Sequence, residues 1–304
     1  MTLEQLRIFL AVAHSQHMTR AAAALNLTQS AVSASVAALE ARYAVRFFDR
    51  VGRRIQLTEA GRHFVDEARA ILARVETAEL SLADWSDQVM GRVRIHASQT
   101  VASYWLPPHL VRLRTLYPRV QVELTVGNTR QAAHALLQGE ADIGVVEGLV
   151  DEPALKATKV ADDELCLVVG IGHPWAGLKR IDARRYGETD WVLREPGSGT
   201  RARFEEHLAS HGIALHRLRV MLEEPSNESI LAAVMSSDAA SVLSGRAVEL
   251  AVAAGRVRAI AIPHMGRAFT ALLHRERHHT RATRSLMDLL VARQGDGSLH
   301  GVMR

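Results

Sequence analysis

The first forty residues follow a pattern of small and apolar positions that predicts two short helices joined by a tight turn. Thr19 is a suitable N-cap, and the alanines at 21–24 form a helix whose small side chains permit another helix to approach closely. Asn26 tolerates the left-handed conformation that stops a helix, and Leu27 can fill the core behind the turn.

The second helix is expected to begin after Thr28, which is also a good N-cap. Its apolar residues recur at spacings of four, three and four and therefore lie on one stripe: Val32, Val36, Leu39 and Tyr43. The opposite side carries short side chains and one amide: Gln29, Ser30, Ser33, Ala34 and Ala37. This geometry is typical of helix-turn-helix DNA binding, in which the second helix enters the major groove. An alanine-rich hairpin with a solvated polar face is the alternative.

Residues 46–61, RFFDRVGRRIQLTEAG, predict a two-stranded wing after these helices. Gly52 lies at a turn between two basic segments, and IQLT is able to form a strand. Arg50, Arg53 and Arg54 at its edges suit contacts with phosphates or with the minor groove.

From Glu59 to Val89, apolar residues recur in steps that alternate between four and three. This heptad spacing predicts a single helix of roughly 46 Å, at 1.5 Å per residue, that pairs with a second copy as a coiled coil. The expected seam contains Phe64, Ala68, Ile71, Val75, Ala78, Leu82, Trp85 and Val89. An amphipathic helix buried on the core of its own chain is the alternative.

After Gly91 short β-segments alternate with helical segments, which predicts an α/β region with a largely parallel sheet. A first unit contains the strands RVRIHA, VQVELTVGN and ADIGVV, and a second unit contains DWVLRE, LRVMLEE, SVLS and VRAIAIP. The last strand, RAFTALLH, and the helix TRSLMDLLVA lack partners in the second unit and are assigned to the first. We therefore expect lobe I at about 91–161 and 266–304, and lobe II at about 162–265.

Composition narrows the class of protein. A chain of 304 residues with 48% hydrophobic side chains can bury the cores of two or three domains. No apolar run reaches the roughly 18 residues of a membrane span, and the N-terminus lacks a cleavage pattern, so we expect a cytoplasmic protein without membrane contacts. Cys166 is the single cysteine, and the histidines at 274, 278 and 279 lack an acidic partner. Neither a metal nor a cofactor is expected.

Charge is distributed unevenly along the chain. Residues 1–58 carry seven arginines against three acidic residues, whereas residues 59–90 carry seven acidic residues against three arginines. The first segment is therefore suited to a polyanion, and the second is not.

Residues 2–61 resemble the winged helix-turn-helix of LysR-type transcriptional regulators. The resemblance rests on LRIFLAVA, on the pattern T-x-x-A-A-x-x-L-N-L-T-Q-S-A-V-S, and on R-x-G-R-R-I-x-L-T-E-A-G. Two positions depart from the family, since Ala34 stands where a large polar residue is frequent and Ala44 stands where glycine is frequent. Base discrimination is then expected to depend on Thr28, Gln29, Ser30, Ser33 and DNA shape.

The resemblance implies a domain order and a set of partners. Residues 1–58 would form the DNA-binding domain, 59–90 the dimerisation helix and 91–304 a two-lobed effector domain like periplasmic binding proteins. The partners would be double-stranded DNA at a pseudo-palindromic operator, a second copy in a homodimer or homotetramer, and RNA polymerase.

Two strand-to-helix junctions are candidates for the effector site, because ligands of such sheets bind at helix N-termini beyond the strand ends. HASQT supplies Ser98, Gln99 and Thr100, and REPGSGTR supplies Ser198, Gly199 and Thr200; Ser226 opens a further helix. Hydroxyls and amides suit a small anion, and in the family residues at these places bind effectors such as sulfur or carbon metabolites. Glu147 would face away, or meet an ammonium or hydroxyl group. Plain helix capping is the alternative.

Other classes of function fit less well. PGSG has Pro196 where the nucleophile elbow of hydrolases requires glycine, and the chain has neither a P-loop nor a dinucleotide fingerprint. We therefore expect that this protein is not an enzyme. A solute-binding module of a transporter or sensor would explain the two lobes but would leave residues 1–90 without a role.

Overall fold

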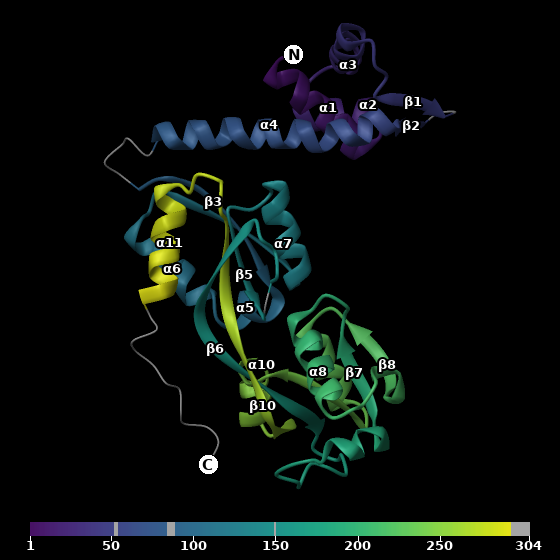
Figure 1. Ribbon diagram of the computed structural model, residues 1–304, viewed down its shortest axis with the longest axis vertical. Coiled ribbons are helices and arrows are strands. Elements are labelled where there is room, and N and C mark those ends of the chain that lie inside the picture. Colours follow the sequence, from purple (N-terminus) through teal and green to yellow (C-terminus); the bar gives the residue numbers. More distant parts are fainter. Residues whose placement is uncertain (52–53, 84–88, 149, 293–304) are drawn as a thin grey trace. The chain divides into compact units, whose positions relative to one another are not determined.

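We describe the protein from a computed structural model, which describes residues 1–51, 54–83, 89–148 and 150–292. The chain forms two compact units, which divide between Trp85 and Ser86 (Figure 1).

The first unit is the predicted winged helix-turn-helix. It contains α1 (Leu3–Ser15), α2 (Met18–Leu25), α3 (Gln29–Tyr43), β1 (Phe48–Val51), β2 (Arg54–Leu57) and α4 (Glu59–Ala83). Helix α1 contacts α2, α3 and α4, so its apolar residues form the centre of the core. In the part of the chain that is described, no single helix is long and apolar enough to cross a membrane; only α2 and α3 together, bent by 108°, have the necessary length and composition.

The turn between α2 and α3 is formed as predicted. Asn26 adopts the left-handed conformation with φ 56°, and the hydroxyl of Thr28 accepts a hydrogen bond from the Ala31 amide at 3.2 Å. Two details were wrong. Helix α2 already begins at Met18, so Thr19 lies inside it and is not the N-cap. Tyr43 is 46% exposed, because the buried stripe of α3 ends at Leu39 and the last turn extends beyond it.

Helix α4 is shorter than the helix that the heptad spacing predicted from Glu59 to Val89. Its described part ends at Ala83, and Val89 is not helical but packs against the core of the second unit. The heptad pattern therefore continues across the boundary between two units. The start of the segment is buried in the core of the first unit, and Val89 at its end packs on the core of the second.

The N-terminal half of α4 packs on its own chain. The ring of Phe64 lies 4.9 Å from that of Phe9 and 4.7 Å from that of Phe47, and Ala68 is fully buried in the same cluster. Ile71 contacts this cluster as well. In this half α4 is therefore an amphipathic helix buried on the core of its own chain, which is the alternative given above. Phe64, Ala68 and Ile71 pack within the chain and do not form the coiled-coil seam that was expected there. Val75 is half-buried, the side chain of Leu82 and all of Trp85 lie outside the described residues, and dimerisation stays a prediction.

The second unit contains one eight-stranded sheet, with strand order β4-β3-β5-β10-β6-β9-β7-β8. Its strands are β3 (Gly91–Ser98), β4 (Val120–Gly127), β5 (Ile143–Glu147), β6 (Leu155–Gly170), β7 (Asp190–Arg194), β8 (Arg219–Glu224), β9 (Ala239–Ser244) and β10 (Val257–His274). Within each lobe the short strands pair in parallel, as predicted: β3 with β4 and β5, and β7 with β8 and β9.

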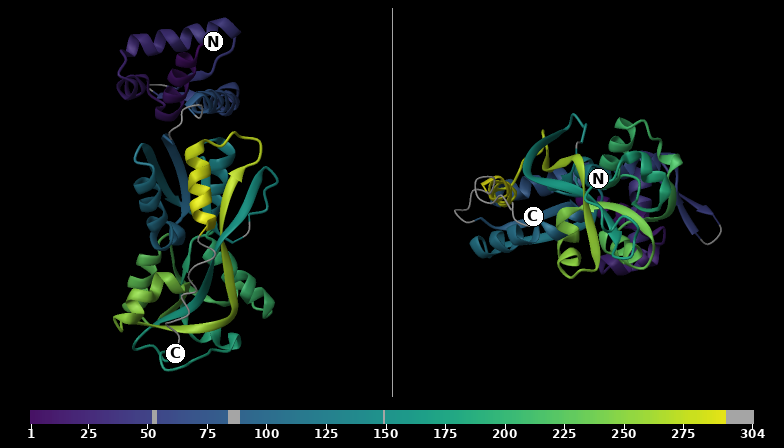
Figure 2. Two further views of the ribbon diagram at one scale, coloured as in Figure 1. Left: turned by 90° about the vertical axis from the view of Figure 1, so that its left-hand side faces the viewer. Right: turned by 90° about the horizontal axis from the view of Figure 1, so that it is seen from below.

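The long antiparallel strands β6 and β10 run through both lobes (Figures 1 and 2). The segments VRAIAIP and RAFTALLH, expected as separate strands, are joined in β10, since the register with β6 shifts between Ala261 and Gly266 without ending the strand. Beyond this shift β10 also pairs with β5, which confirms that RAFTALLH belongs to the first lobe. Two crossing strands are thus the covalent hinge between the lobes.

Helices cover the sheet in each lobe. Lobe I carries α5 (Gln99–Tyr104), α6 (Pro107–Leu116), α7 (Thr129–Gln138) and α11 (Arg281–Ala292); lobe II carries α8 (Gly199–Ser210), α9 (Asn227–Met235) and α10 (Gly245–Ala253), with short 3₁₀ turns at Ala183–Glu188 and Leu215–Arg217. Helix α10 and the 3₁₀ turns were not predicted. Each lobe has its own core, around Ile95 and Leu286 in lobe I and around Trp191 and Phe204 in lobe II. The lobes are therefore packed independently, and they touch where α9 of lobe II meets α5 of lobe I.

Candidate functional site

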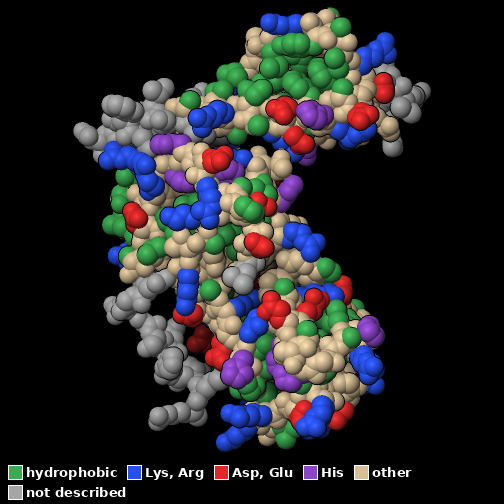
Figure 3. All heavy atoms as spheres, in the orientation of Figure 1, with side chains coloured by type: hydrophobic (Ala, Val, Ile, Leu, Met, Phe, Trp, Pro, Cys, Tyr) green, Lys and Arg blue, Asp and Glu red, His purple; other side chains and the backbone are tan. Residues whose placement is uncertain are grey.

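The exposed surface of α3 is made mostly of small side chains. Gln29 and Ser30 are exposed at its N-terminus, and Ser33 is half-buried. The exposed alanines of the helix are Ala31, Ala34, Ala37, Ala38 and Ala41. Figure 3 shows a hydrophobic surface over this part of the first unit. A helix with so little side-chain bulk can bring its backbone close to the floor of a major groove.

The wing is fixed to this helix by a contact that the sequence did not reveal. One carboxylate oxygen of Glu40 accepts hydrogen bonds from the amides of Phe47, at 2.7 Å, and Phe48, at 3.2 Å. Arg50 and Arg54 lie on the two paired strands β1 and β2, but their side chains, and the whole of Arg53, are outside the described residues. Their proposed DNA contacts remain predictions.

Replacing Gln29 by alanine is expected to weaken DNA binding by about 1–3 kcal/mol at particular base pairs, because an exposed amide at the start of a recognition helix is suited to read a base edge. Electrophoretic mobility shifts on operator variants would measure this. Glu4→Gln, on α1, is a control on the same unit. A uniform loss on every DNA sequence would contradict base reading and assign Gln29 to positioning.

The effector residues predicted in lobe I lie together at the end of β3 and the start of α5. Ser98 and Thr100 are buried, whereas Gln99 is half-buried. The Ser98 hydroxyl makes no cap bond and lies near the Glu147 carboxyl, whose pKa it lowers. For this position the capping alternative therefore does not account for the hydroxyl.

In lobe II the hydroxyls of Ser198 and Ser226 do cap helices. Ser198 accepts a hydrogen bond from the Thr200 amide at 3.2 Å, and Ser226 accepts one from the Ser229 amide at 3.1 Å. Helix capping, the alternative to ligand binding, therefore accounts for both of these hydroxyls. Gly199 has a different role, since a Cβ atom there would lie 2.5 Å from the carbonyl oxygen of Glu147 in the other lobe. Glycine thus permits the lobes to touch.

Asn227, at the start of α9, connects the two lobes directly and was missed in the sequence. Its side-chain amide donates to the Thr100 hydroxyl at 3.1 Å, and its backbone amide donates to the Gln99 side chain at 3.2 Å. Arg194 in turn donates to the Asn227 side-chain oxygen at 3.0 Å. An asparagine within a helical stretch gives no sequence signal for such a role, because only the closed lobes bring it to Thr100.

A buried ionic cluster lies at the hinge. Arg267 on β10 lies opposite Asp163 on β6, and its Nε donates to the Asp163 carboxylate at 2.8 Å. Its Nη1 donates to the Thr200 hydroxyl at 3.0 Å, and its Nη2 lies 3.7 Å from a carboxylate oxygen of Glu147. Arg267 and Asp163 were not predicted, since each stands in a strand pattern and only the register of β6 and β10 pairs them.

Glu147 points into this cluster and does not face away. Burial by itself raises the pKa of this carboxyl, but the Arg267 guanidinium and the nearby hydroxyls of Ser98 and Thr100 outweigh it and lower the pKa. The carboxylate is therefore ionised at neutral pH. The cluster combines the carboxylates of Glu147 and Asp163 with the Arg267 guanidinium and with three hydroxyls, those of Ser98, Thr100 and Thr200, and the Arg246 guanidinium lies 3.8 Å from Asp163. It is therefore not a simple anion site.

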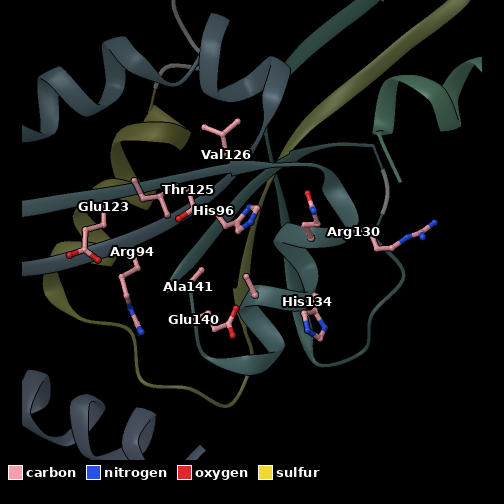
Figure 4. Close-up of a pocket in the computed structure, with 12 residues that line it drawn as sticks. Arg94, His96, Glu123, Thr125, Val126, Arg130, His134, Glu140 and Ala141 are labelled. Carbon is pink, nitrogen blue, oxygen red and sulfur yellow. The ribbon is translucent and has the colours of Figure 1, made fainter. Parts of the chain in front are cut away.

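A separate hollow of about 680 Å³ lies on lobe I between β3, β4 and α7 (Figure 4). His96 points into it and is buried, which lowers the pKa of its imidazole although Glu140 opposes this, and Arg130 extends away from it. None of the predicted effector residues lines this hollow. In the described ranges no cluster of His, Cys, Asp and Glu has the geometry to hold a metal ion.

Comparisons with known proteins agree with both units. Residues 3–62 match the bacterial regulatory helix-turn-helix family of LysR proteins, and residues 86–295 match the LysR substrate binding domain. The uncharacterized HTH-type transcriptional regulator YeiE of Escherichia coli is 35% identical over 292 residues, which cover 94% of this chain and 96% of YeiE. The helix-turn-helix match leaves the alternative of a solute-binding module without DNA binding unsupported.

Solved structures show the same architecture. Full-length CbnR, complexed with its target DNA, is 22% identical and superposes with a TM-score of 0.71 over 96% of this chain and 99% of CbnR. The regulatory domain of Synechocystis CcmR, in complex with 2-PG, is 27% identical with a TM-score of 0.61 over 67% of this chain and 97% of that domain. From the two family matches and the fold, the chain belongs to the LysR family of DNA-binding transcriptional regulators, with an N-terminal helix-turn-helix and a C-terminal effector-binding domain.

Proposed function

We propose that this regulator changes its DNA binding when a small anionic or zwitterionic metabolite binds in the cleft between the two lobes. The observation that supports this most is the meeting of three helix N-termini, those of α5, α8 and α9, across the cleft. There the Asn227 amide of one lobe donates to the Thr100 hydroxyl of the other at 3.1 Å. A ligand in this position would bind both lobes and shift their relative arrangement by its differential affinity.

The chemistry of the cleft supports a ligand that combines an acid with a hydrogen-bond donor. Helix N-termini and hydroxyls suit the acid group, and the ionised Glu147 suits an ammonium or hydroxyl group. The complex of the similar CcmR regulatory domain with 2-PG supports a small-molecule ligand for a domain of this kind.

The partners of the regulator are part of the proposal. Two copies would pair through the C-terminal half of α4, which brings two winged units to the half-sites of a pseudo-palindromic operator. A homotetramer and a contact with RNA polymerase would follow the pattern of the family. Because DNA is the partner, we place the protein in the cytoplasm, and we assign it no catalytic role and no cofactor.

The test is a thermal-shift screen of small carboxylic acids and sulfur oxyanions, followed by calorimetric titration of any compound found. Thr100→Val and Thr200→Val each remove one hydroxyl at nearly constant shape, and each should cost about 1.5–3 kcal/mol of ligand affinity. Thr115→Val is the matched control, because the Thr115 hydroxyl donates to the Val111 carbonyl oxygen within α6. If both variants bind the compound as tightly as the parent, the ligand lies elsewhere.

A further inference from the structure

The carboxylate of Glu228 accepts hydrogen bonds from three side chains where the two lobes meet. Glu228 lies in the first turn of α9 in lobe II, and its side chain is exposed. It accepts hydrogen bonds from the Gln99 side-chain amide at 2.7 Å and from the Tyr104 hydroxyl at 2.8 Å, both in lobe I. The Ser226 hydroxyl of its own lobe donates at 2.9 Å. One carboxylate thus bridges the two lobes.

The protonation states are consistent with a charged group bound to neutral donors. Burial raises the pKa of Tyr104, and the hydrogen bond to Glu228 raises it further, so the phenol remains a donor. Burial also raises the pKa of Glu228, but the hydrogen bonds from Tyr104, Ser226 and Gln99 outweigh this effect and lower it. Glu228 is therefore ionised, and its contacts are charge-assisted.

We propose that Gln99, Tyr104 and Ser226 form an oxyanion subsite and that the Glu228 carboxylate occupies it as an internal substitute for the ligand. The ligand class is a small oxyanion, either a carboxylate or a sulfur oxyanion, which would displace Glu228 and accept the same three hydrogen bonds. This inference rests on the proposed function in taking the cleft as the effector site. To that proposal it adds the position at which the acid group of the ligand binds, and it names Glu228 as the residue that competes with the ligand for this position.

Two features of the surrounding chain define this class of ligand. The three donors are neutral, and the guanidinium of Arg194, which acts on Tyr104, is already engaged with Glu195 at 2.9 Å. A single anionic group therefore suits the subsite better than several. The buried Arg267 guanidinium is likewise engaged with the carboxylates of Glu147 and Asp163, so it does not offer a charge to a second acid group.

The internal carboxylate lowers the apparent affinity of the subsite. A tethered group competes at the effective concentration set by its short connection to α9. Ligand binds only to the fraction of molecules in which Glu228 has left the donors, so the apparent dissociation constant rises by the inverse of that fraction. Neutralising Glu228 should therefore increase affinity for an oxyanion, which is opposite to the usual effect of changing a residue within a site.

The experiment uses the full chain and two probes, sodium sulfate and sodium acetate, titrated by calorimetry at constant ionic strength. Glu228→Gln is expected to bind at least one probe roughly tenfold more tightly than the parent, the factor that corresponds to one charge-assisted hydrogen bond. Adding Tyr104→Phe to this variant should reverse much of the gain. Glu206→Gln, which removes an exposed charge of lobe II that pairs with Arg203, is the matched control and should bind like the parent.

The outcomes separate this inference from the proposed function. Equal affinity in the parent and in Glu228→Gln, absence of binding to Glu228→Gln, or the same gain in Glu206→Gln would each overturn the inference. If Glu228→Gln shows no gain in ligand affinity while the Thr100 and Thr200 variants lose affinity, the proposed effector site is supported, and Glu228 is not an internal substitute for the ligand. If Glu228→Gln gains ligand affinity and the affinities of the threonine variants are unchanged, the oxyanion subsite is supported, and the proposed contacts of the ligand with Thr100 and Thr200 are contradicted.

Discussion

Replacing Arg267 by methionine is expected to lower the free energy of unfolding of the effector unit by about 3–5 kcal/mol, the usual cost of removing one partner from a buried ion pair. The side chains of Arg267, Asp163 and Glu147 are 2%, 1% and 2% exposed. Methionine fills a similar volume but leaves the buried Glu147 carboxylate without the cation beside it, and it leaves Asp163 with the more distant Arg246 guanidinium at 3.8 Å. Urea denaturation followed by circular dichroism would measure the change.

Two further measurements make this result specific. Arg258→Met changes an exposed arginine of the same strand and should alter stability by less than about 0.5 kcal/mol. The lowered pKa of Glu147 stabilises the parent above the ordinary value of 4.5, and this contribution is lost as the pH falls through the folded value. In Arg267→Met the carboxyl loses the cation that lowered its pKa, so the penalty should shrink as the pH falls from neutrality. A penalty that does not change with pH would contradict an electrostatic origin.

Replacing Gly199 by valine is expected to disfavour the closed arrangement of the lobes by about 3 kcal/mol, at the upper end of the usual cost of overpacking. A Cβ atom at this position would lie 2.5 Å from the Glu147 carbonyl oxygen and 3.1 Å from the Thr129 hydroxyl, both in lobe I. The carbonyl belongs to the backbone of β5 and cannot turn aside, so the lobes must separate. The population of the closed form should fall roughly a hundredfold.

Small-angle scattering and ligand titration would detect this opening. The isolated effector unit is not required, because the comparison is between two full chains that differ at one position. Gly187→Val is the matched control, since a Cβ atom there meets nothing within 4 Å. We expect Gly199→Val to lose ligand affinity while both lobe cores keep their stability, and Gly187→Val to behave as the parent. Unchanged affinity in Gly199→Val would show that ligand binding does not need the lobes in contact.

The amino-acid sequence by itself determined the local structure of the DNA-binding unit and the order of the elements. The stop at Asn26, the cap at Thr28 and the buried stripe up to Leu39 depend on residues a few positions apart, and short-range preferences decide them. The alternation of strands and helices after Gly91 gave the two lobes for the same reason. Periodicity failed at α4, because heptad spacing states that a face is buried and does not state which partner buries it.

Only the tertiary structure decided the site between the lobes. Ser98, Thr100 and Thr200 could be named from their positions at strand ends, but their partners are far away in the sequence. Arg267 meets Asp163 because β6 and β10 pair in one register, and Glu228 meets Gln99 and Tyr104 because the lobes close. Such contacts carry no periodic signal along the chain, since charge pairing and cross-lobe hydrogen bonds depend on distances that arise only when both lobes have folded.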